Sequence, residues 1–475
     1  MAVVTATTSN QTQAPNPTQT PALIPTQSTD HTGTVAATPL HPDFVATLAA
    51  GFAADPARLR AQNAVTRTPV GEVAMNHARA TSIRTSVSNQ LDDWSVANQK
   101  KSGRCWLFAA LNLLRVGAKQ RLGVKEFEFS QNYAMYWDKL ERANFFCEDV
   151  VATAGEPIDS RLVGFLLQTL LGDGGQWDMA VSVFLKHGVV PKEAMPETQS
   201  SSDTDAMNTQ LRARLRKGAL ALRAAVADGG DVAAVKAEVL TDVHTILTIH
   251  LGTPPTSFDW QWTDDEKQFH RDGVLTPQQF FERYVTLDLT QYVCLVDDPR
   301  REHPKGAALT VANLGNVIGG RQVRYVNAPM ATIKELAAAS IVAGEPVWFG
   351  CDVKPQMHRE DGIWAADLFD YSGVYGVDLS TTKEERVVSG ESAMTHAMLL
   401  TGVDVVDGTP RRWRVENSWG DDKADKGFFT MDDSWFDEYV FEVVVRTDAL
   451  PEDLRPALTA EPIVLPAWDP MGALA

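Results

Sequence analysis

Three side chains of the types used in nucleophilic catalysis lie far apart in the chain: Cys105, His396 and Asn417. A cysteine attacks a carbonyl carbon as its thiolate, so its pKa has to be lowered, and a helix N-terminus or a nearby imidazolium can do this. A histidine can protonate the leaving amine when a third group holds its ring in one orientation. These residue types predict acyl transfer. Cys105 would be the nucleophile, His396 the general base and acid, and Asn417 the acceptor for the imidazole N–H.

Gln99 and Cys105 could supply the two donors that this chemistry needs for the negative oxygen of the tetrahedral intermediate. The side-chain amide of Gln99 lies six residues before Cys105, and the backbone N–H of Cys105 lacks an intrahelical partner if a helix starts there. Removing one such donor typically costs ~3 kcal/mol of transition-state stabilisation. Gly103 lets the backbone approach a substrate closely, and Trp419 could shield the bond between histidine and asparagine from water.

Each of these residues, taken alone, has a simpler explanation. A lone cysteine is more often a small core residue, and a histidine near a strand is more often structural. An Asn-Ser-Trp-Gly run could be a turn at the end of a strand. The order of the motifs is far more specific than any one of them: glutamine, then Cys-Trp, then His-Ala, then Asn-Ser-Trp-Gly.

The segments around these residues predict a helical part followed by a β-rich part. Polar and turn-forming residues lead up to Cys105, and the apolar run that follows favours a buried central helix that stops near Gly123. His396 begins an apolar strand and Asn417 ends another. Strands are predicted at residues 346–353, 397–403, 412–417, 427–431 and 440–445. Helices first and strands last indicate an α+β fold.

Residues 99–106 resemble the active-site segment of the papain-like cysteine peptidases. The Ser-Gly-Arg-Cys-Trp form at 102–106, together with Asn-Ser-Trp-Gly-Asp at 417–421, is similar to the bleomycin hydrolase and aminopeptidase C branch. The resemblance implies a papain-like fold with a helical half and an antiparallel, barrel-like β half. It also implies a thiol protease that removes N-terminal residues from peptides and hydrolyses related amides through a thioester. Gln99 would be its oxyanion donor, and no cofactor or metal is expected.

The spacing between the nucleophile and the histidine indicates an insertion. Cys105 and His396 are 291 residues apart (396 − 105), whereas papain-like enzymes generally have ~130–150. The Ala-, Arg- and Leu-rich stretch at 203–272, broken at Gly229 and Gly230, is predicted to be an inserted helical hairpin. The expected organisation is a disordered Thr/Gln/Pro-rich tail at 1–40, a helical catalytic half at 41–202, the hairpin at 203–272, a β half at 273–460 and a C-terminal arm at 461–475.

The C-terminal residues resemble the arm of that branch, which lies in the substrate cleft. The resemblance implies that the α-carboxylate of Ala475 pairs with the α-ammonium of a peptide that has a free N-terminus, while the arm blocks longer chains. Pro466 and Pro470 would stiffen the approach. A frayed tail is the alternative, although Trp468 and Met471 are costly to leave in water.

The resemblance also implies a homohexamer in which the inserted hairpin reaches between subunits. Five basic residues gather on its first helix, where they could form a solvated face, contact another subunit or bind an anionic ligand: Arg212, Arg214, Arg216, Lys217 and Arg223. A nucleic-acid-binding role through this basic run is not favoured, because the net charge is −18. An inactive scaffold is disfavoured because both Cys105 and His396 are present, and nothing marks an amine-acceptor site for transglutaminase-like chemistry.

Composition places the chain among reduced, soluble, globular proteins. Hydrophobic residues make up 44% of its 475 residues, which is ample for a core. Four cysteines without a C-x-x-C pair indicate neither a disulfide framework nor a zinc site. The first basic residue is Arg58, so the preceding residues show neither a signal nor a transit peptide. No stretch approaches the ~20 apolar residues of a membrane span. These features predict a cytoplasmic protein that does not bind a membrane.

Overall fold

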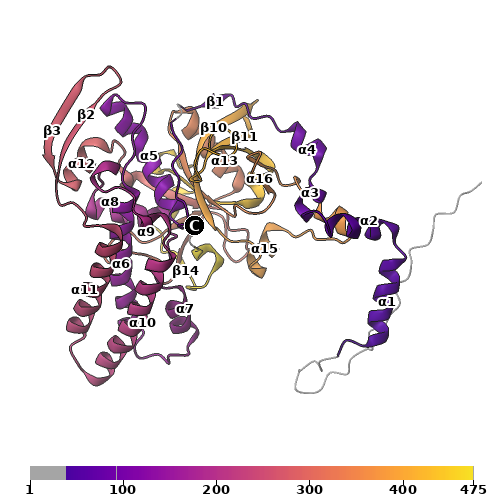
Figure 1. The fold of residues 1–475 in the computed structure, drawn as a ribbon, viewed down its shortest axis with the longest axis horizontal. Coiled ribbons are helices and arrows are strands. Elements are labelled where there is room, and N and C mark those ends of the chain that lie inside the picture. Colours follow the sequence, from indigo (N-terminus) through magenta and orange to yellow (C-terminus); the bar gives the residue numbers. More distant parts are fainter. Residues whose placement is uncertain (1–38, 92–93, 474–475) are drawn as a thin grey trace, which may run out of the picture. The chain divides into compact units, whose positions relative to one another are not determined.

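The computed structural model describes residues 39–91 and 94–473, whose elements are shown in Figure 1. Ala475 and all but the last two residues of the predicted disordered tail lie outside this part of the chain. The described chain divides into two compact units, of which the smaller combines residues 39–74 with Tyr371–Asp378. The helices of the smaller unit are α1 (Pro42–Ala53), α2 (Pro56–Val65), α3 (Val70–Ala74) and α14 (Tyr371–Tyr375).

Helices dominate the first half of the larger unit. The predicted helix after the polar segment is confirmed: α5 runs from Cys105 to Leu122, and Gly123 ends it in the left-handed conformation (φ 66°). The other helical elements of this half are α4 (His77–Ser82), α6 (Gln131–Ala152), α7 (Arg161–Thr169), α8 (Trp177–His187), η1 (Lys192–Ala194), α9 (Gln199–Ser202), α10 (Asp205–Asp228), α11 (Val232–Leu251), α12 (Pro277–Tyr284) and η2 (Leu289–Gln291). Among all helices of residues 39–91 and 94–473, none combines the length and the apolar character that a membrane crossing requires.

The stretch that we expected to be a helical hairpin is helical only in its first part. α10 and α11 pack against each other and against α6, with Gly229 ending α10 in the left-handed conformation. From residue 258 onward the chain instead forms an antiparallel β-hairpin of β2 (Phe258–Thr263) and β3 (Phe269–Leu275). Aromatic residues occupy alternate positions in Phe-Asp-Trp-Gln-Trp-Thr, and this period of two favours a strand.

The second half of the larger unit is built on one large mixed sheet. Its strands are β1 (Asn89–Gln90), β4 (Tyr292–Val296), β5 (Ala308–Val311), β6 (Tyr325–Asn327), β7 (Val347–Cys351), β8 (Met357–His358), β9 (Ile363–Trp364), β10 (His396–Val406), β11 (Thr409–Glu416), β12 (Phe428–Asp432), β13 (Val440–Arg446) and β14 (Ile463–Leu465). Their order is β14-β5-β6-β4-β13-β7-β10-β11-β12-β9-β8, with β1 paired to β10. Most pairs are antiparallel, as predicted, but β4–β6, β5–β14 and β9–β12 are parallel.

Alternate residues of the central strands face two separate cores. Trp348 and Leu399 pack with the helical half, whereas Phe349 and Leu400 pack with α13 (Met330–Val342). α5 contacts β10 and β7, so the nucleophile's helix lies against the sheet, as Figure 1 shows. The fold is therefore α+β with a helical half and a β half. Its remaining short helices are α15 (Lys383–Ser389), α16 (Asp433–Tyr439), η3 (Thr447–Ala449), η4 (Arg455–Leu458) and η5 (Pro470–Gly472).

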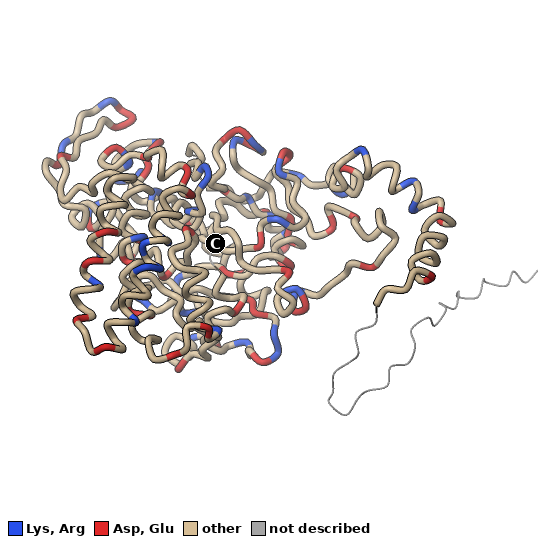
Figure 2. The backbone as a smooth tube through the Cα atoms, turned by 60° about the horizontal axis from the view of Figure 1, so that its bottom comes forward, with Lys and Arg blue, Asp and Glu red and all other residues tan. Residues whose placement is uncertain are grey.

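Acidic and basic residues are interspersed along the described chain (Figure 2). Arg214, Arg216 and Arg223 of α10 have partners among the described residues. Arg214 forms ion pairs with two acidic residues of α11, and Arg216 donates to the carbonyl oxygen of Leu167. Arg223 donates to two carbonyl oxygens at the end of α6 and just beyond it. The bonds of Arg216 and Arg223 hold α10 on the helical half, whereas the ion pairs of Arg214 join α10 to α11 and offset one of the five positive charges.

Candidate active site

Cys105 occupies the first position of α5, and the residue is 2% exposed. The preceding residue, Arg104, makes no cap hydrogen bond with its side chain. Its buried guanidinium instead donates to both carboxylate oxygens of Glu197, at 3.0 and 2.7 Å. The backbone N–H groups of the first turn are therefore not capped by that side chain, and they are the groups that can stabilise negative charge on sulfur or on a bound oxygen.

Burial dominates the acidity of the Cys105 thiol. It raises the pKa to about 11, while the backbone N–H groups of Ala397, Trp106 and Cys105 itself act in the opposite direction. The expectation of a lowered pKa is therefore wrong for the isolated thiol, because burial of the thiolate raises the pKa more than the backbone N–H groups lower it. The contact of the thiol with Ala397 also shows where the thiol lies relative to the histidine. Since Ala397 follows His396, the thiol lies at the start of the strand that carries the imidazole.

The structure brings His396 and Asn417 into hydrogen-bond contact. His396 begins β10, Asn417 follows β11, and the imidazole Nε2 lies 2.9 Å from Asn417 Oδ1. Because an amide oxygen only accepts, Nε2 is assigned the proton and donates it, which leaves Nδ1 free to take a proton. Burial lowers the pKa of His396 to about 4; the bond to Asn417 opposes this shift, and the guanidinium of Arg359 adds to it.

The indole of Trp419 stacks on the imidazole of His396. The two ring centroids are 5.1 Å apart with an angle of 30° between the planes. The guanidinium carbon of Arg359 lies 4.5 Å from the centroid of the indole. His396 is 5% exposed, so its hydrogen bond to the asparagine lies away from bulk water, which strengthens it.

Ser418 connects the glutamine to the asparagine loop. The backbone N–H of Gln99 donates to the Ser418 carbonyl at 2.8 Å, and the Ser418 hydroxyl donates to Gln99 Oε1. Gln99 Nε2 donates one hydrogen to the carbonyl of Ser102. Because a primary amide carries two hydrogens on nitrogen, the second stays available for a substrate oxygen.

Asp173 fixes the segment that precedes the nucleophile. Its carboxylate accepts from the backbone N–H of Gly103 at 3.2 Å, and its carbonyl accepts from the Trp106 indole at 2.7 Å. The Lys139 ammonium, which is fully buried, lies 2.5 Å from the same carboxylate and helps to hold the pKa of Asp173 well below its usual range against the opposing effect of burial. A Cβ on Gly175 would come within 2.5 Å of the Trp106 ring, so this loop packs directly on the residue after Cys105.

The C-terminal arm is anchored along its described length. β14 pairs with β5, and the Asp469 carboxylate makes two 2.8 Å hydrogen bonds with the guanidinium of Arg300. Nearer its end, the carbonyl of Ala473 accepts from Gln176 Nε2 at 2.7 Å. Gln176 follows Gly175, so the arm reaches the loop that packs on Trp106. The predicted contact of Ala475 with a substrate ammonium lies outside the described residues.

A comparison with protein families decides the classification. The model of the Peptidase C1-like family matches residues 39–472. The chain belongs to the Peptidase C1-like family. This match contains Gln99, Cys105, His396 and Asn417, as well as Gly103 and Trp419.

Individual members of the Peptidase C1-like family agree with the branch predicted from the motifs. An aminopeptidase C from Listeria monocytogenes is 43% identical over 421 residues, which cover 89% of this chain and 96% of that protein. A bleomycin hydrolase from Gallus gallus is 46% identical over 391 residues, covering 80% and 86%. The crystal structure of pepw from Lactobacillus rhamnosis superimposes with a TM-score of 0.90 at 44% identity, covering 92% and 99%. These names give no support to a nucleic-acid-binding role.

Three residues of this Peptidase C1-like site are not found by sequence reasoning: Ser418, Asp173 and Gln176. Ser418 carries a signal, because it lies inside the Asn-Ser-Trp-Gly run, but its bond to Gln99 joins residues 319 positions apart. Asp173 and Gln176 lie in or beside a glycine-rich stretch that predicts only a loop. Nothing in their spacing points to the lysine on α6 or to the C-terminal arm that they contact.

Proposed function

We propose that the chain is a cysteine aminopeptidase that removes N-terminal residues from peptides and hydrolyses related amides. The observation that carries the proposal is the 2.9 Å hydrogen bond from His396 to Asn417, with the thiol of Cys105 beside the backbone of Ala397. The aminopeptidase C and bleomycin hydrolase relatives support the substrate class.

In this mechanism Cys105 attacks and His396 moves the protons. The thiol proton passes to Nδ1 of His396, and the thiolate and imidazolium stabilise one another, which offsets the burial cost that each charge has alone. The sulfur then adds to the carbonyl carbon of the scissile amide. The negative oxygen accepts hydrogen bonds from the Cys105 N–H and from the second Nε2 hydrogen of Gln99.

Collapse of the tetrahedral intermediate separates the two products. The imidazolium of His396 gives its proton to the amine nitrogen, the C–N bond breaks, and the acyl group stays on sulfur as a thioester. His396 next takes a proton from water, whose oxygen attacks the thioester carbon, and the C–S bond breaks to release the acid. Asn417 holds the ring through both transfers, because its Oδ1 accepts from Nε2 in the neutral and the charged ring alike.

The arm is proposed to restrict the enzyme to free N-termini. Its anchor on Gln176 brings residue 473 to the loop beside Trp106. A carboxylate carried past this point by Ala475 would pair with the substrate ammonium and block a chain that continues further. Gly103 would let the substrate backbone approach the nucleophile, and Trp419 would border the same site.

Turnover of an aminoacyl fluorogenic amide tests the proposed function. The wild-type chain should hydrolyse the amide with a free N-terminus and refuse its N-acetylated form, because acetylation removes the ammonium. Cys105→Ala should abolish turnover while the circular dichroism spectrum stays unchanged. Cys147→Ala, which alters another buried thiol on α6, serves as the matched control and should keep its activity. A loss smaller than about 10³-fold in Cys105→Ala would contradict the assignment.

We also propose that the protein is a cytoplasmic homohexamer. Phe44, Leu48 and Phe52 follow one another at intervals of four on α1 and are 39%, 54% and 37% exposed. An apolar stripe of this kind favours contact with a second copy. All four cysteines are free thiols, which suits a reducing compartment. Size-exclusion chromatography with light scattering should give the mass of six 52.0 kDa chains; a monomer would contradict the assembly.

A further inference from the structure

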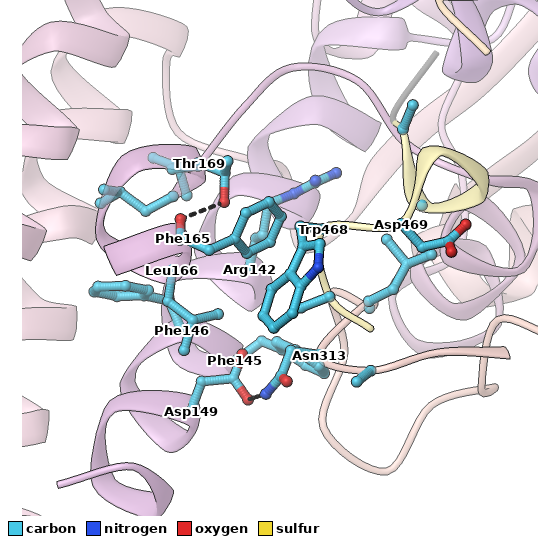
Figure 3. Close-up of a pocket in the computed structure, with 18 of the residues that line it drawn as sticks. Arg142, Phe145, Phe146, Asp149, Phe165, Leu166, Thr169, Asn313, Trp468 and Asp469 are labelled. Atoms are coloured by element: carbon cyan, nitrogen blue, oxygen red, sulfur yellow. Dashed lines mark hydrogen bonds between the residues drawn. The ribbon is translucent and has the colours of Figure 1, made fainter. Parts of the chain in front are cut away.

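A cavity of about 420 Å³ lies beside the C-terminal arm, and none of the four proposed catalytic residues lines it (Figure 3). It is bounded by α6, α7, residues 312–315 and the arm. Four of its lining side chains are aromatic: Phe145, Phe146, Phe165 and Trp468. Figure 3 shows the indole of Trp468 projecting from the arm toward the side chains of the two helices. This size and this apolar lining are typical of sites for small molecules.

Asp149 lines this cavity, and its carboxylate forms no ion pair with any of the described residues. It accepts a hydrogen bond from Asn313 Nδ2 at 2.9 Å, and burial raises its pKa to about 6. The other two charged side chains that line the cavity each have a partner: Arg142 with Asp138 at 3.0 Å, and Asp469 with Arg300 at 2.8 Å. At neutral pH the lining of the cavity therefore carries one carboxylate, that of Asp149, without an ion-pair partner among the described residues, while the guanidinium of Arg161 lies on the Trp468 indole.

We propose that this cavity binds a small organic cation, an ammonium group joined to an aromatic or branched apolar body. The ammonium pairs with the Asp149 carboxylate, and the apolar body packs among the four aromatic rings. A partly buried carboxylate gains most from a cation that is itself removed from water. The faces of aromatic rings attract the same cation through their quadrupoles.

The indole ring of Trp468 already contacts a cationic side chain in this structure. The guanidinium carbon of Arg161 lies 4.0 Å from the centroid of the indole. Because residues 467–470 and 472–473 of the arm also line the cavity, a bound ligand contacts the arm directly. A ligand in the cavity thus restrains the arm. Through the arm it can affect the loop at Gln176, which the arm contacts.

Calorimetric titration of the full chain with phenethylammonium at about pH 7.5, where Asp149 is ionised, tests the site. We expect Asp149→Asn to weaken binding at least tenfold, because the amide keeps the bond to Asn313 but loses the charge. Glu148→Gln is the matched control and should bind like the wild type, since Glu148 is paired with Lys236 and does not line the cavity. Uncharged 2-phenylethanol has the same size and should bind to the wild type at least tenfold more weakly than phenethylammonium. Its affinity should be the same for the wild type, Asp149→Asn and Glu148→Gln.

A second variant tests the aromatic wall. Trp468→Ala should weaken both ligands, and phenethylammonium should slow amide hydrogen exchange in residues 466–473 of the wild type. Equal affinity of the ammonium for wild type and Asp149→Asn, or binding of 3-phenylpropionate as tight as that of the ammonium, would overturn the proposal, as would no binding at all. These readouts need no peptide turnover, so their failure is separate from a failure of the proposed peptidase activity.

Discussion

Asn112 Nδ2 donates a 2.7 Å hydrogen bond to Glu416 Oε1. Asn112 lies about two turns after Cys105 on α5, and Glu416 immediately precedes Asn417 at the end of β11. Both side chains are buried. The bond therefore connects α5, which begins at Cys105, to the end of β11, which Asn417 follows. Glu416 is thus a positioning residue.

Truncating Glu416 should slow chemistry more than it weakens binding. In Glu416→Ala the two elements lose their buried bond, and a displacement of about 1 Å at the reacting groups can cost ~10²-fold in rate. We expect kcat to fall ~10–100-fold with little change in KM. Glu416→Gln keeps an acceptor for Asn112 and should stay within about threefold of the wild type. Glu360→Gln, an exposed partner of Lys423, is the control. A change confined to KM would refute the positioning role.

Gln99 and Ser418 should behave as one unit. Gln99→Ala removes an oxyanion donor and should lower kcat by ~10²-fold. Ser418→Ala releases Gln99 Oε1 and should lower kcat by ~10-fold, because the amide is then less firmly oriented. In the double variant the loss should match that of Gln99→Ala alone, since both changes act through the same amide. Additive losses would show that the serine acts independently of the glutamine.

Arg359 should lower the proton affinity of the imidazole measurably. In a Cys105→Ala background, where His396 titrates without the thiol, Arg359→Gln should move the NMR titration midpoint of His396 to higher pH. The reason is that the guanidinium disfavours the imidazolium, so its removal lets the ring keep its proton longer. Salt should shrink the difference. Arg301→Gln serves as the control, and an unchanged or lower midpoint in Arg359→Gln would contradict the electrostatic contribution.

The catalytic motifs and the main elements follow from local sequence, whereas the supporting contacts do not. The apolar run after Cys105 predicts α5, and the β-rich runs predict β7, β10, β11, β12 and β13. The contact between Asp173 and Lys139 has no such signal, because it depends on how α6 packs beside a glycine-rich loop. The acidity of Cys105 is likewise a property of the folded environment: sequence reveals the helix start, but not the depth of burial that outweighs it.

The anchor between Asp469 and Arg300 should control selectivity for free N-termini. Removing one partner of a buried ion pair typically costs about 3–5 kcal/mol, although Arg300 keeps its bonds to Asp298. In Asp469→Asn we expect a looser arm, faster proteolysis after residue 460, and at least a tenfold rise in turnover of the N-acetylated amide relative to the free one. Glu461→Gln changes an exposed acid of the same segment and should leave the ratio unchanged. An unaltered ratio in Asp469→Asn would argue against the arm as the selective element.

Glu442 should make the folded protein less stable as pH rises. The residue is completely buried on β13, and burial raises its pKa from 4.5 to about 8. Between these values the unfolded chain has released the proton while the folded chain still holds it, so the free energy of unfolding falls by about 1.4 kcal/mol per pH unit from this group. Glu442→Gln removes the titration. In denaturant unfolding, the free energy of unfolding of the variant relative to that of the wild type should therefore rise from about pH 5 to 8 and stay level above pH 8. For the exposed Glu335→Gln, the difference from the wild type should be the same at every pH. A constant difference in Glu442→Gln as well would mean that the carboxyl is not held protonated in the folded state.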